Sequence, residues 1–140
     1  MIDFFTRTTR RFLVGKDQEF VFKAATDTLD IDFQDKKGGL YLHIPFCKSL
    51  CPFCPYNRIR YEREQAELYL AAVLCEIDLY WKRLGSLEIT SIYIGGGTPT
   101  NMIDELGVML ARIQQRFTVT GSICIETGVS DINIYTVKKL

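Results

Sequence analysis

The chain alternates between two apolar periodicities, and this alternation limits the folds it can adopt. Three short apolar segments have the length and composition of strands, at 40–44, 88–94 and 121–126. Three longer segments follow them with the spacing of helices, at about 60–84, 101–117 and 130–140. Because the connections are short, the repeated order of strand and helix predicts a parallel sheet built from right-handed crossovers. The predicted fold class is α/β.

The predicted helices have recognisable ends. Gly85 is a natural stop for the first helix, and the carboxylates of Asp104 and Glu105 suit the first turn of the second. Ser130 is the expected N-cap of the third. One face of the first helix is expected to be buried, because its apolar residues recur at spacings of three and four: Leu68, Ala71, Ala72, Cys75 and Leu79. Cys75 and Cys124 are accordingly interpreted as buried small side chains.

Composition indicates the class of protein. The chain has 140 residues, of which 47% are apolar, enough for one domain with a core. Its 17 basic residues balance 17 acidic ones, so no strong field would attract nucleic acid. Without a secretion signal or an apolar run of transmembrane length, we expect a cytoplasmic protein with no membrane span. In the cytosol, clustered cysteines bind metal or do redox chemistry more often than they form disulfides.

The chain is expected to contain one domain and an extension. Residues 1–37 are interpreted as the N-terminal extension, with a short helix at 17–29 and a polar linker at 30–39. Residues 38–140 would form the domain. Three parallel strands leave an edge that a closed barrel would pair, and a full α/β barrel takes about twice this length or more. We therefore expect a truncated chain that is poorly soluble or associates on its own.

A cysteine cluster follows the first predicted strand, in the stretch YLHIPFCKSLCPFCPY. Cys47, Cys51 and Cys54 have the spacing Cys-x3-Cys-x2-Cys, which lets three thiolates of one loop reach a single inorganic group. A [4Fe–4S] cluster normally takes four cysteine ligands. With three, one iron keeps an open coordination site where a substrate or cofactor can bind. The spacing therefore favours an iron–sulfur cluster.

Other uses of these thiols remain open on spacing alone. Zinc would need a fourth ligand, for which His43 is available, although the usual paired Cys-x2-Cys halves are missing. The sequence CPFC is a Cys-x-x-C redox pair, but this leaves Cys47 without a role. The simplest alternative is three incidental buried thiols.

The stretch YLHIPFCKSLCPFC resembles the cluster motif of radical S-adenosylmethionine (SAM) enzymes. More narrowly, it is similar to the oxygen-independent coproporphyrinogen III oxidase group, which includes haem chaperones and anaerobic haem-degrading methyltransferases. The segment GGGTPT, at 95–100, matches the second motif of this family in wording and in place. The resemblance covers about 38–130. It implies the N-terminal part of a partial (β/α) barrel, truncated after about three βα units.

The resemblance also implies a chemistry. Cys47, Cys51 and Cys54 would hold a [4Fe–4S] cluster, and SAM would bind its open iron through its amino and carboxylate groups. Reductive cleavage of SAM would give a 5′-deoxyadenosyl radical, which abstracts hydrogen from a tetrapyrrole substrate, coproporphyrinogen or haem. An external donor such as flavodoxin or ferredoxin would supply the electron. The expected protein is an oxidoreductase of porphyrin biosynthesis, the alternatives within the group being a haem chaperone or a haem-degrading methyltransferase.

Six residues match the SAM-contacting positions of this family, and none is assigned as catalytic. They are Tyr41, Phe53, Gly96, Gly97, Thr98 and Glu126. Tyr41 and Phe53 have ordinary core packing as an alternative role, and Glu126 could be a solvated carboxylate at a strand end. His43 is interpreted either as a packed strand residue or as a group that tunes the cluster. The sequence CPY at 54–56 departs from the Cys-Gly or Cys-Asp expected of the biosynthetic oxidase, which leaves the exact activity open.

Overall fold

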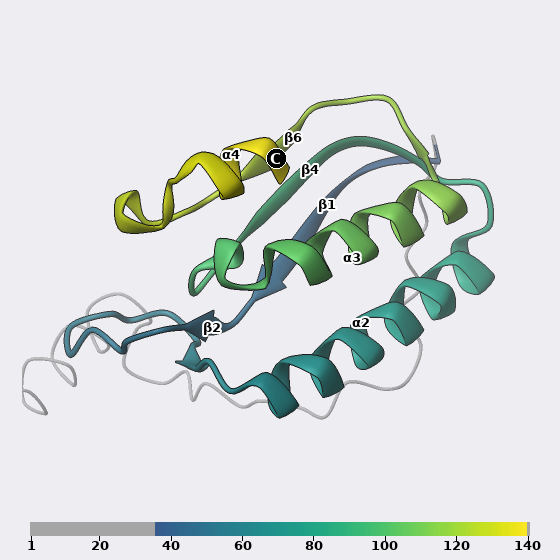
Figure 1. Ribbon diagram of the computed structural model, residues 1–140. Helices are drawn as coiled ribbons and strands as arrows, with labels where there is room; N and C mark the ends of the chain where they lie inside the picture. Colours follow the sequence, from purple (N-terminus) through teal and green to yellow (C-terminus); the bar gives the residue numbers. More distant parts are fainter. Residues whose placement is uncertain (1–35, 140) are drawn as a thin grey trace, which may run out of the picture. The chain divides into compact units, whose positions relative to one another are not determined.

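The computed structural model describes residues 36–139 and contains a parallel sheet (Figure 1). Strand β1 (Lys37–Ile44) pairs in parallel with β4 (Glu88–Gly96), which lies in the centre of the sheet. On its other side, β4 pairs in parallel with β5 (Thr118–Val119) and then with β6 (Ile123–Ile125). The predicted α/β class and the parallel strand order are confirmed.

Helices follow the strands in the predicted order. Helix α2 (Arg63–Leu84) comes between β1 and β4, and α3 (Ile103–Arg116) follows β4 after the 3₁₀ turn η1 (Pro99–Met102). The turn η2 (Val129–Asp131) and the short helix α4 (Ile134–Lys139) follow β6. Helices α2 and α3 contact each other and lie side by side in Figure 1. No helix among the described residues is long and apolar enough to cross a membrane.

The core lies between one face of the sheet and these two helices. Alternate strand residues point into it, because successive side chains of a strand face opposite sides. The buried strand residues are Leu42, Ile44, Ile89, Ile92 and Ile94. The helices contribute Ala66, Val73, Ile77, Leu106, Met109 and Ile113. Removal of this apolar surface from water is the main stabilising contribution to the domain.

A bulge in β4 shifts the pairing of the sheet. Gly38 pairs with Ile89 but Gly39 pairs with Ser91, so Thr90 is an extra residue in β4. The bulge allows Ile89 and Ile92, three positions apart, to face the same core. Beside the bulge, the strand that pairs with β4 changes from β5, which ends at Val119, to β6, which begins at Ile123. The predicted strand at 121–126 therefore contains only β6, and β5 is an additional short strand before the predicted range.

The strand and helix boundaries agree with the prediction at most ends. Strand β1 begins at Lys37, so the last residues of the predicted linker are strand. Helix α2 ends as expected at Gly85, whose φ is +65° and whose N–H bonds to the Trp81 carbonyl at 2.9 Å. Asp104 and Glu105 lie in the first turn of α3. The predicted helix at 17–29 and nearly all of the predicted extension lie outside the described residues.

Ser130 does not cap the last helix. It lies in η2, and α4 begins four residues later. The cap is Asn133, whose Oδ1 accepts the N–H groups of Tyr135 at 2.9 Å and Thr136 at 3.0 Å. Thr136 Oγ1 in turn accepts the N–H of Asn133 at 2.9 Å. This reciprocal pair occupies donors that a helix N-terminus leaves open, so the helix starts at Ile134.

The predicted buried face of α2 is exposed to solvent. Leu68 and Leu79 are 68% and 64% exposed, and Cys75 is exposed as well. The helix packs through its opposite side, where Val73 and Ile77 are buried. The error arose because α2 carries apolar residues on both sides, and only the packing against the sheet decides between them. Cys124, predicted to be buried, is also exposed, because it lies on the sheet face that no described helix covers.

A cluster of charged and aromatic side chains joins α2 to α3 near their C-terminal ends. Asp78 accepts hydrogen bonds from Arg112 Nη1 at 2.6 Å and Arg116 Nε at 2.7 Å. The Arg116 guanidinium also lies 4.5 Å from the centre of the Trp81 ring, an arrangement favourable to a cation–π interaction. These contacts cross the interface between the helices, so we interpret the cluster as packing.

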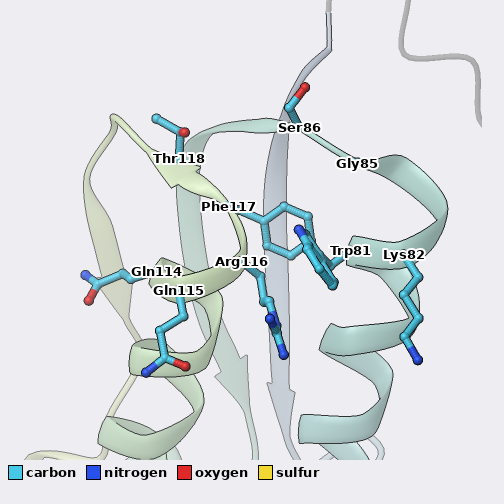
Figure 2. Close-up of a pocket in the computed structure, with 9 residues that line it drawn as sticks. All are labelled: Trp81, Lys82, Gly85, Ser86, Gln114, Gln115, Arg116, Phe117 and Thr118. Atoms are coloured by element: carbon cyan, nitrogen blue, oxygen red, sulfur yellow. The ribbon is translucent and has the colours of Figure 1, made fainter.

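A cavity of about 660 Å³ adjoins this cluster (Figure 2). Its lining comes from the C-terminal parts of α2 and α3 and from the segments that lead into β4 and β5, including Gly85, Ser86 and Thr118. It therefore lies at the amino ends of the strands. None of the residues predicted to bind a cofactor lines it.

Gly121 is expected to be essential for the change from β5 to β6. A Cβ atom at this position would lie 1.6 Å from the Thr90 carbonyl oxygen, so Gly121→Ala must displace the bulge. We expect the free energy of unfolding to fall by about 1–3 kcal/mol, measured by urea denaturation. Gly107→Ala in α3 is the control: no atom lies within 4 Å of its Cβ position, and the change should raise stability by about 1 kcal/mol. Equal stability of the Gly121 variant and the unsubstituted chain would contradict the crossing geometry.

The Asp78 cluster predicts sensitivity to acid. The hydrogen bond from Arg116, with the charges of Arg112 and Arg116, holds the pKa of Asp78 below its ordinary value. A lowered carboxyl pKa stabilises the fold above the unfolded pKa of about 4, and this contribution is lost as the pH falls through the folded pKa. Asp78→Asn should therefore lower the urea midpoint at pH 7, and its deficit should shrink below pH 4. Glu67→Gln, in an exposed pair with Arg63 on the same helix, should change little. A deficit independent of pH would contradict this account.

Candidate functional site

Three segments with predicted site residues meet at the carboxyl ends of the strands. The cysteine loop follows β1, the glycine segment ends β4, and Glu126 follows β6. The Glu126 N–H bonds to the Ile94 carbonyl at 2.8 Å, which continues the pairing of β6 with β4 by one residue. In parallel α/β domains, ligands bind at this edge of the sheet. The topology thus brings the predicted residues together from three separate parts of the sequence.

The cysteine loop is closed at its base by a small parallel pairing that the sequence did not predict. Strand β2 (Phe46–Cys47) pairs with β3 (Ile59–Arg60). The N–H of Ile59 bonds to the Pro45 carbonyl and that of Tyr61 to the Cys47 carbonyl, both at 2.8 Å. These bonds anchor both ends of the segment 48–58.

Further contacts hold the loop between these anchors. Arg58 Nη2 donates to the Cys51 carbonyl, and the N–H of Cys54 bonds to the same oxygen at 3.3 Å. Lys48 forms an ion pair with Asp131 of η2, with Nζ and Oδ1 2.7 Å apart. The loop is therefore connected to the segment that follows Glu126.

The three thiols of the loop differ in exposure. Cys47 is buried, Cys54 is half-buried and Cys51 is exposed, and all three are free of disulfides. Among residues 36–139, no group of three or more His, Cys, Asp or Glu side chains is arranged to hold a metal ion. The loop thus supplies three of the four cysteine donors that a [4Fe–4S] cluster normally takes, and binding would require their thiols to draw together.

The glycine segment packs directly on the base of the cysteine loop. The N–H of Gly97 bonds to the Ile44 carbonyl at 2.8 Å and that of Thr98 to the Phe46 carbonyl at 2.9 Å. A Cβ atom on Gly97 would lie 2.8 Å from the Phe46 oxygen and 2.9 Å from Cys47 Sγ. The Thr98 hydroxyl lies 3.7 Å from the same sulfur. Only a glycine at position 97 leaves Cys47 where it is.

Gly96 makes a similar close approach to His43. Its φ is +121°, a conformation that residues with a side chain rarely adopt. A Cβ atom there would lie 2.7 Å from His43 Cε1 and 2.8 Å from the Ile44 carbonyl oxygen. The backbone of β4 therefore runs tightly against the end of β1, where the cysteine loop begins.

Both ring nitrogens of His43 are engaged. Nε2 donates to the Asn57 carbonyl at 3.0 Å, because a carbonyl can only accept, and Nδ1 then accepts the Tyr41 hydroxyl at 3.0 Å. The imidazole therefore joins β1 to the far end of the cysteine loop. In this arrangement no lone pair remains for zinc, which weighs against a Cys₃His site.

The predicted aromatic contacts are exposed rather than part of the core. Tyr41 is 57% exposed on the sheet face opposite the helices, and Phe53 is 86% exposed in the loop. The aromatic residue that does pack beneath the loop is Phe46, which the sequence reading did not single out. Its ring meets the rings of Tyr61 and Tyr69 edge-on, with centroids 5.9 and 5.5 Å apart.

The open face of the sheet carries a second feature that the sequence reading missed. Tyr41, Tyr93 and Cys124 are in register across β1, β4 and β6. The rings of Tyr41 and Tyr93 are stacked with centroids 6.0 Å apart. The sequence does contain a signal for Tyr93: in a strand with Ile92 and Ile94 buried, Tyr93 must lie on the opposite face, which it shares with Gly95.

The polar groups of this face converge over Gly95. The position of a Cβ atom on Gly95 lies 2.9 Å from Glu126 Oε2, 3.0 Å from Tyr93 Cε1 and 3.3 Å from the Tyr41 hydroxyl. The charge of Glu126 is the largest of the causes that raise the pKa of Tyr93, so the phenol stays protonated at neutral pH. The absence of a side chain at Gly95 leaves this space open.

Comparison with known proteins identifies relatives of this chain. It is 29% identical over 104 residues to the haem chaperone HemW of Bacillus subtilis, covering 71% of this chain and 27% of that protein. It is 32% identical over 107 residues to the oxygen-independent coproporphyrinogen III oxidase of Escherichia coli, covering 73% of this chain and 23% of that protein. No family model matches the chain.

A solved structure has the same fold. The coproporphyrinogen III oxidase HemN of Escherichia coli, described as a radical SAM enzyme, superposes with a TM-score of 0.66 at 29% identity. The match covers 72% of this chain and 24% of that structure. The chain thus spans about a quarter of the length of its curated relatives. The resemblance to this radical SAM group and the partial radical SAM fold are confirmed.

The packing of Gly97 predicts how accessible Cys47 is to reagents. In the native chain, Cys47 should react with N-ethylmaleimide more slowly than the other four cysteines, because it alone is buried. Gly97→Ala should speed its modification by about tenfold or more, because the new methyl group would overlap Cys47 Sγ and displace it. Overpacking that destabilises the closed arrangement by about 1.4 kcal/mol makes the exposed form of the thiol about tenfold more populated. Pulse labelling followed by peptide mass spectrometry measures each cysteine separately. Gly107→Ala should leave all rates unchanged, and an unaltered Cys47 rate in the Gly97 variant would contradict the contact.

Proposed function

We propose that this chain, which is related in sequence and fold to the radical SAM group of oxygen-independent coproporphyrinogen III oxidases and HemW haem chaperones, provides the cluster-binding and SAM-binding part of such a protein. The observation that carries the proposal is the contact of the cysteine loop with the glycine segment. Gly97 and Thr98 bond to the two residues that flank Pro45, directly before Cys47. A loop of sulfur donors and an open backbone segment therefore lie side by side at the ligand-binding edge of the sheet.

Cys47, Cys51 and Cys54 would be the cluster ligands. Their donor chemistry fits a [4Fe–4S] group with one iron left open. When bound, the cluster supplies the electron for cleavage of SAM to methionine and a 5′-deoxyadenosyl radical. The chain's own contribution is to bind, orient and shield the reacting molecules. Cys47 is already held by Gly97 and Thr98, so it would be the fixed ligand of the three.

The SAM contacts would come from both sides of the glycine segment. The backbone at Gly96 and Gly97 can approach a ligand closely because no Cβ atom intervenes. The Glu126 carboxylate, over Gly95, would receive the amino group of SAM through a charge-assisted hydrogen bond. Tyr41 borders this space from β1. Thr98 and Phe53 complete the proposed set, with Phe53 in the cysteine loop free to cover the ligand.

The substrate class would be a tetrapyrrole, and the first candidate activity is oxidative decarboxylation of coproporphyrinogen III in the whole protein. An external one-electron donor such as flavodoxin or ferredoxin would reduce the cluster. A haem chaperone is the second candidate, since HemW of Bacillus subtilis is among the relatives, and a haem-degrading methyltransferase the third. Haem binding by cluster-loaded protein without formation of 5′-deoxyadenosine favours the chaperone. Formation of 5′-deoxyadenosine with loss of CO₂ from coproporphyrinogen favours the oxidase.

Two exposed cysteines give a matched test of the ligand assignment. After anaerobic reconstitution with iron and sulfide, Cys51→Ala should lose nearly all bound iron, because two thiols cannot hold the cluster. Cys75→Ala should load iron as the unsubstituted chain does, because Cys75 lies on α2, away from the loop. Iron and sulfide analysis with the absorbance near 400 nm measures the loading. Equal loading of the two variants would show that other thiols hold the metal.

A further inference from the structure

We infer that Tyr93 is a positioning residue for the Glu126 carboxylate, holding it so that its remaining lone pairs face the amino group of the bound ligand. This inference rests on the proposed function, which assigns Glu126 to that amino group. Tyr93 itself would not touch the reacting atoms. It would act through Glu126.

The placement of the two side chains comes from the sheet register. Tyr93 lies in β4, two residues before Gly95, and Glu126 follows the last residue of β6. Glu126 Oε2 and Tyr93 Cε1 lie 2.9 and 3.0 Å from one point, the Cβ position of Gly95. The phenol and the carboxylate therefore share the space that the missing side chain leaves. Glu126 raises the pKa of Tyr93 chiefly through its charge, so Tyr93 remains an O–H donor.

The other groups on this face are less suited to hold the carboxylate. The Tyr41 hydroxyl is directed to His43 Nδ1, and His43 Nε2 to the Asn57 carbonyl. These bonds fix Tyr41 within a chain that runs toward the cysteine loop. The Cys124 thiol, next to Tyr93 on β6, is a weak donor. Of the two tyrosines on this face, Tyr93 is thus the one whose hydroxyl is not directed to His43.

The consequence is a carboxylate ordered before the ligand arrives. An exposed glutamate samples several rotamers, and binding must select one of them. A single O–H donor from Tyr93 leaves most of the acceptor positions of Glu126 available. The stacking of Tyr93 on Tyr41 keeps the phenol itself in place. The site would therefore bind its cationic group with less loss of conformational freedom.

The contact can be tested in the chain without any cofactor. The titration of Tyr93, observed by NMR of ¹³C-labelled tyrosine and assigned with Tyr93→Phe, should move to lower pH in Glu126→Gln. Tyr135 is the internal control, because its own partner is Asp104, 2.8 Å away, and its titration should not move. A Cys124→Ser background removes the neighbouring thiol, so that only Glu126 differs between the two titrations. A Tyr93 titration that does not move when the Glu126→Gln substitution is made would overturn the inference.

The role in binding is tested by a double-mutant cycle on reconstituted protein. Tyr93→Phe should weaken SAM binding by about tenfold in equilibrium dialysis, as expected for loss of a hydrogen bond to a charged group. In the Glu126→Gln background the same change should have little effect, which a merely structural role would not produce. Tyr80→Phe on α2 should bind as the unsubstituted chain does. Unchanged binding by Tyr93→Phe overturns the inference alone, whereas iron-loaded chain that binds no SAM overturns the proposed function and the inference with it.

Discussion

The parallel pairing of β1 with β4 is the constraint on which the site depends. It places His43 opposite Gly95 and Ile44 opposite Gly96, at the last two positions of both strands. The chain of β1 then turns into the cysteine loop just where β4 turns into its glycine segment. The approach is so close that side chains at Gly96 and Gly97 would overlap His43, Ile44 or Cys47. The glycines are therefore required by the packing of the protein before any ligand is considered.

The two faces of the sheet have separate tasks as a result of the strand period of two. Leu42, Ile44, Ile92 and Ile94 face the helices and form the core. Tyr41, Tyr93 and Glu126 are on the face that no described helix covers. Residues that stabilise the fold and residues of the proposed ligand site thus alternate along the same strands. A change in register by one residue would exchange them, so the bulge at Thr90 matters for the site as well as for the core.

The sequence predicted the parts of the structure that depend on local pattern. Strand positions, the end of α2 at Gly85 and the cysteine loop follow from periodicity, glycine and proline. The buried face of α2 did not, because apolar residues lie on both sides of this helix and the sheet selects Val73 and Ile77. The pairing of β2 with β3 joins two-residue strands across the cysteine loop, too short to show a periodicity, and the Asn133 cap competes with Ser130. Tyr93 was missed because the group that it approaches, Glu126, comes from a separate segment just after β6.

The cysteine loop shows how far the fold prepares its site. Cys47 is fixed by the glycine segment, while Cys51 and Cys54 lie in a segment anchored at its base by β2 and β3. Ligands that do not converge in advance gain their geometry when the metal binds, so that part of the binding free energy is used to order the loop. In the proposed site, Gly97, Thr98 and His43 would reduce this cost, because they fix one sulfur and one end of the loop. The remaining rearrangement is confined to a short segment, and the sheet beneath it need not change.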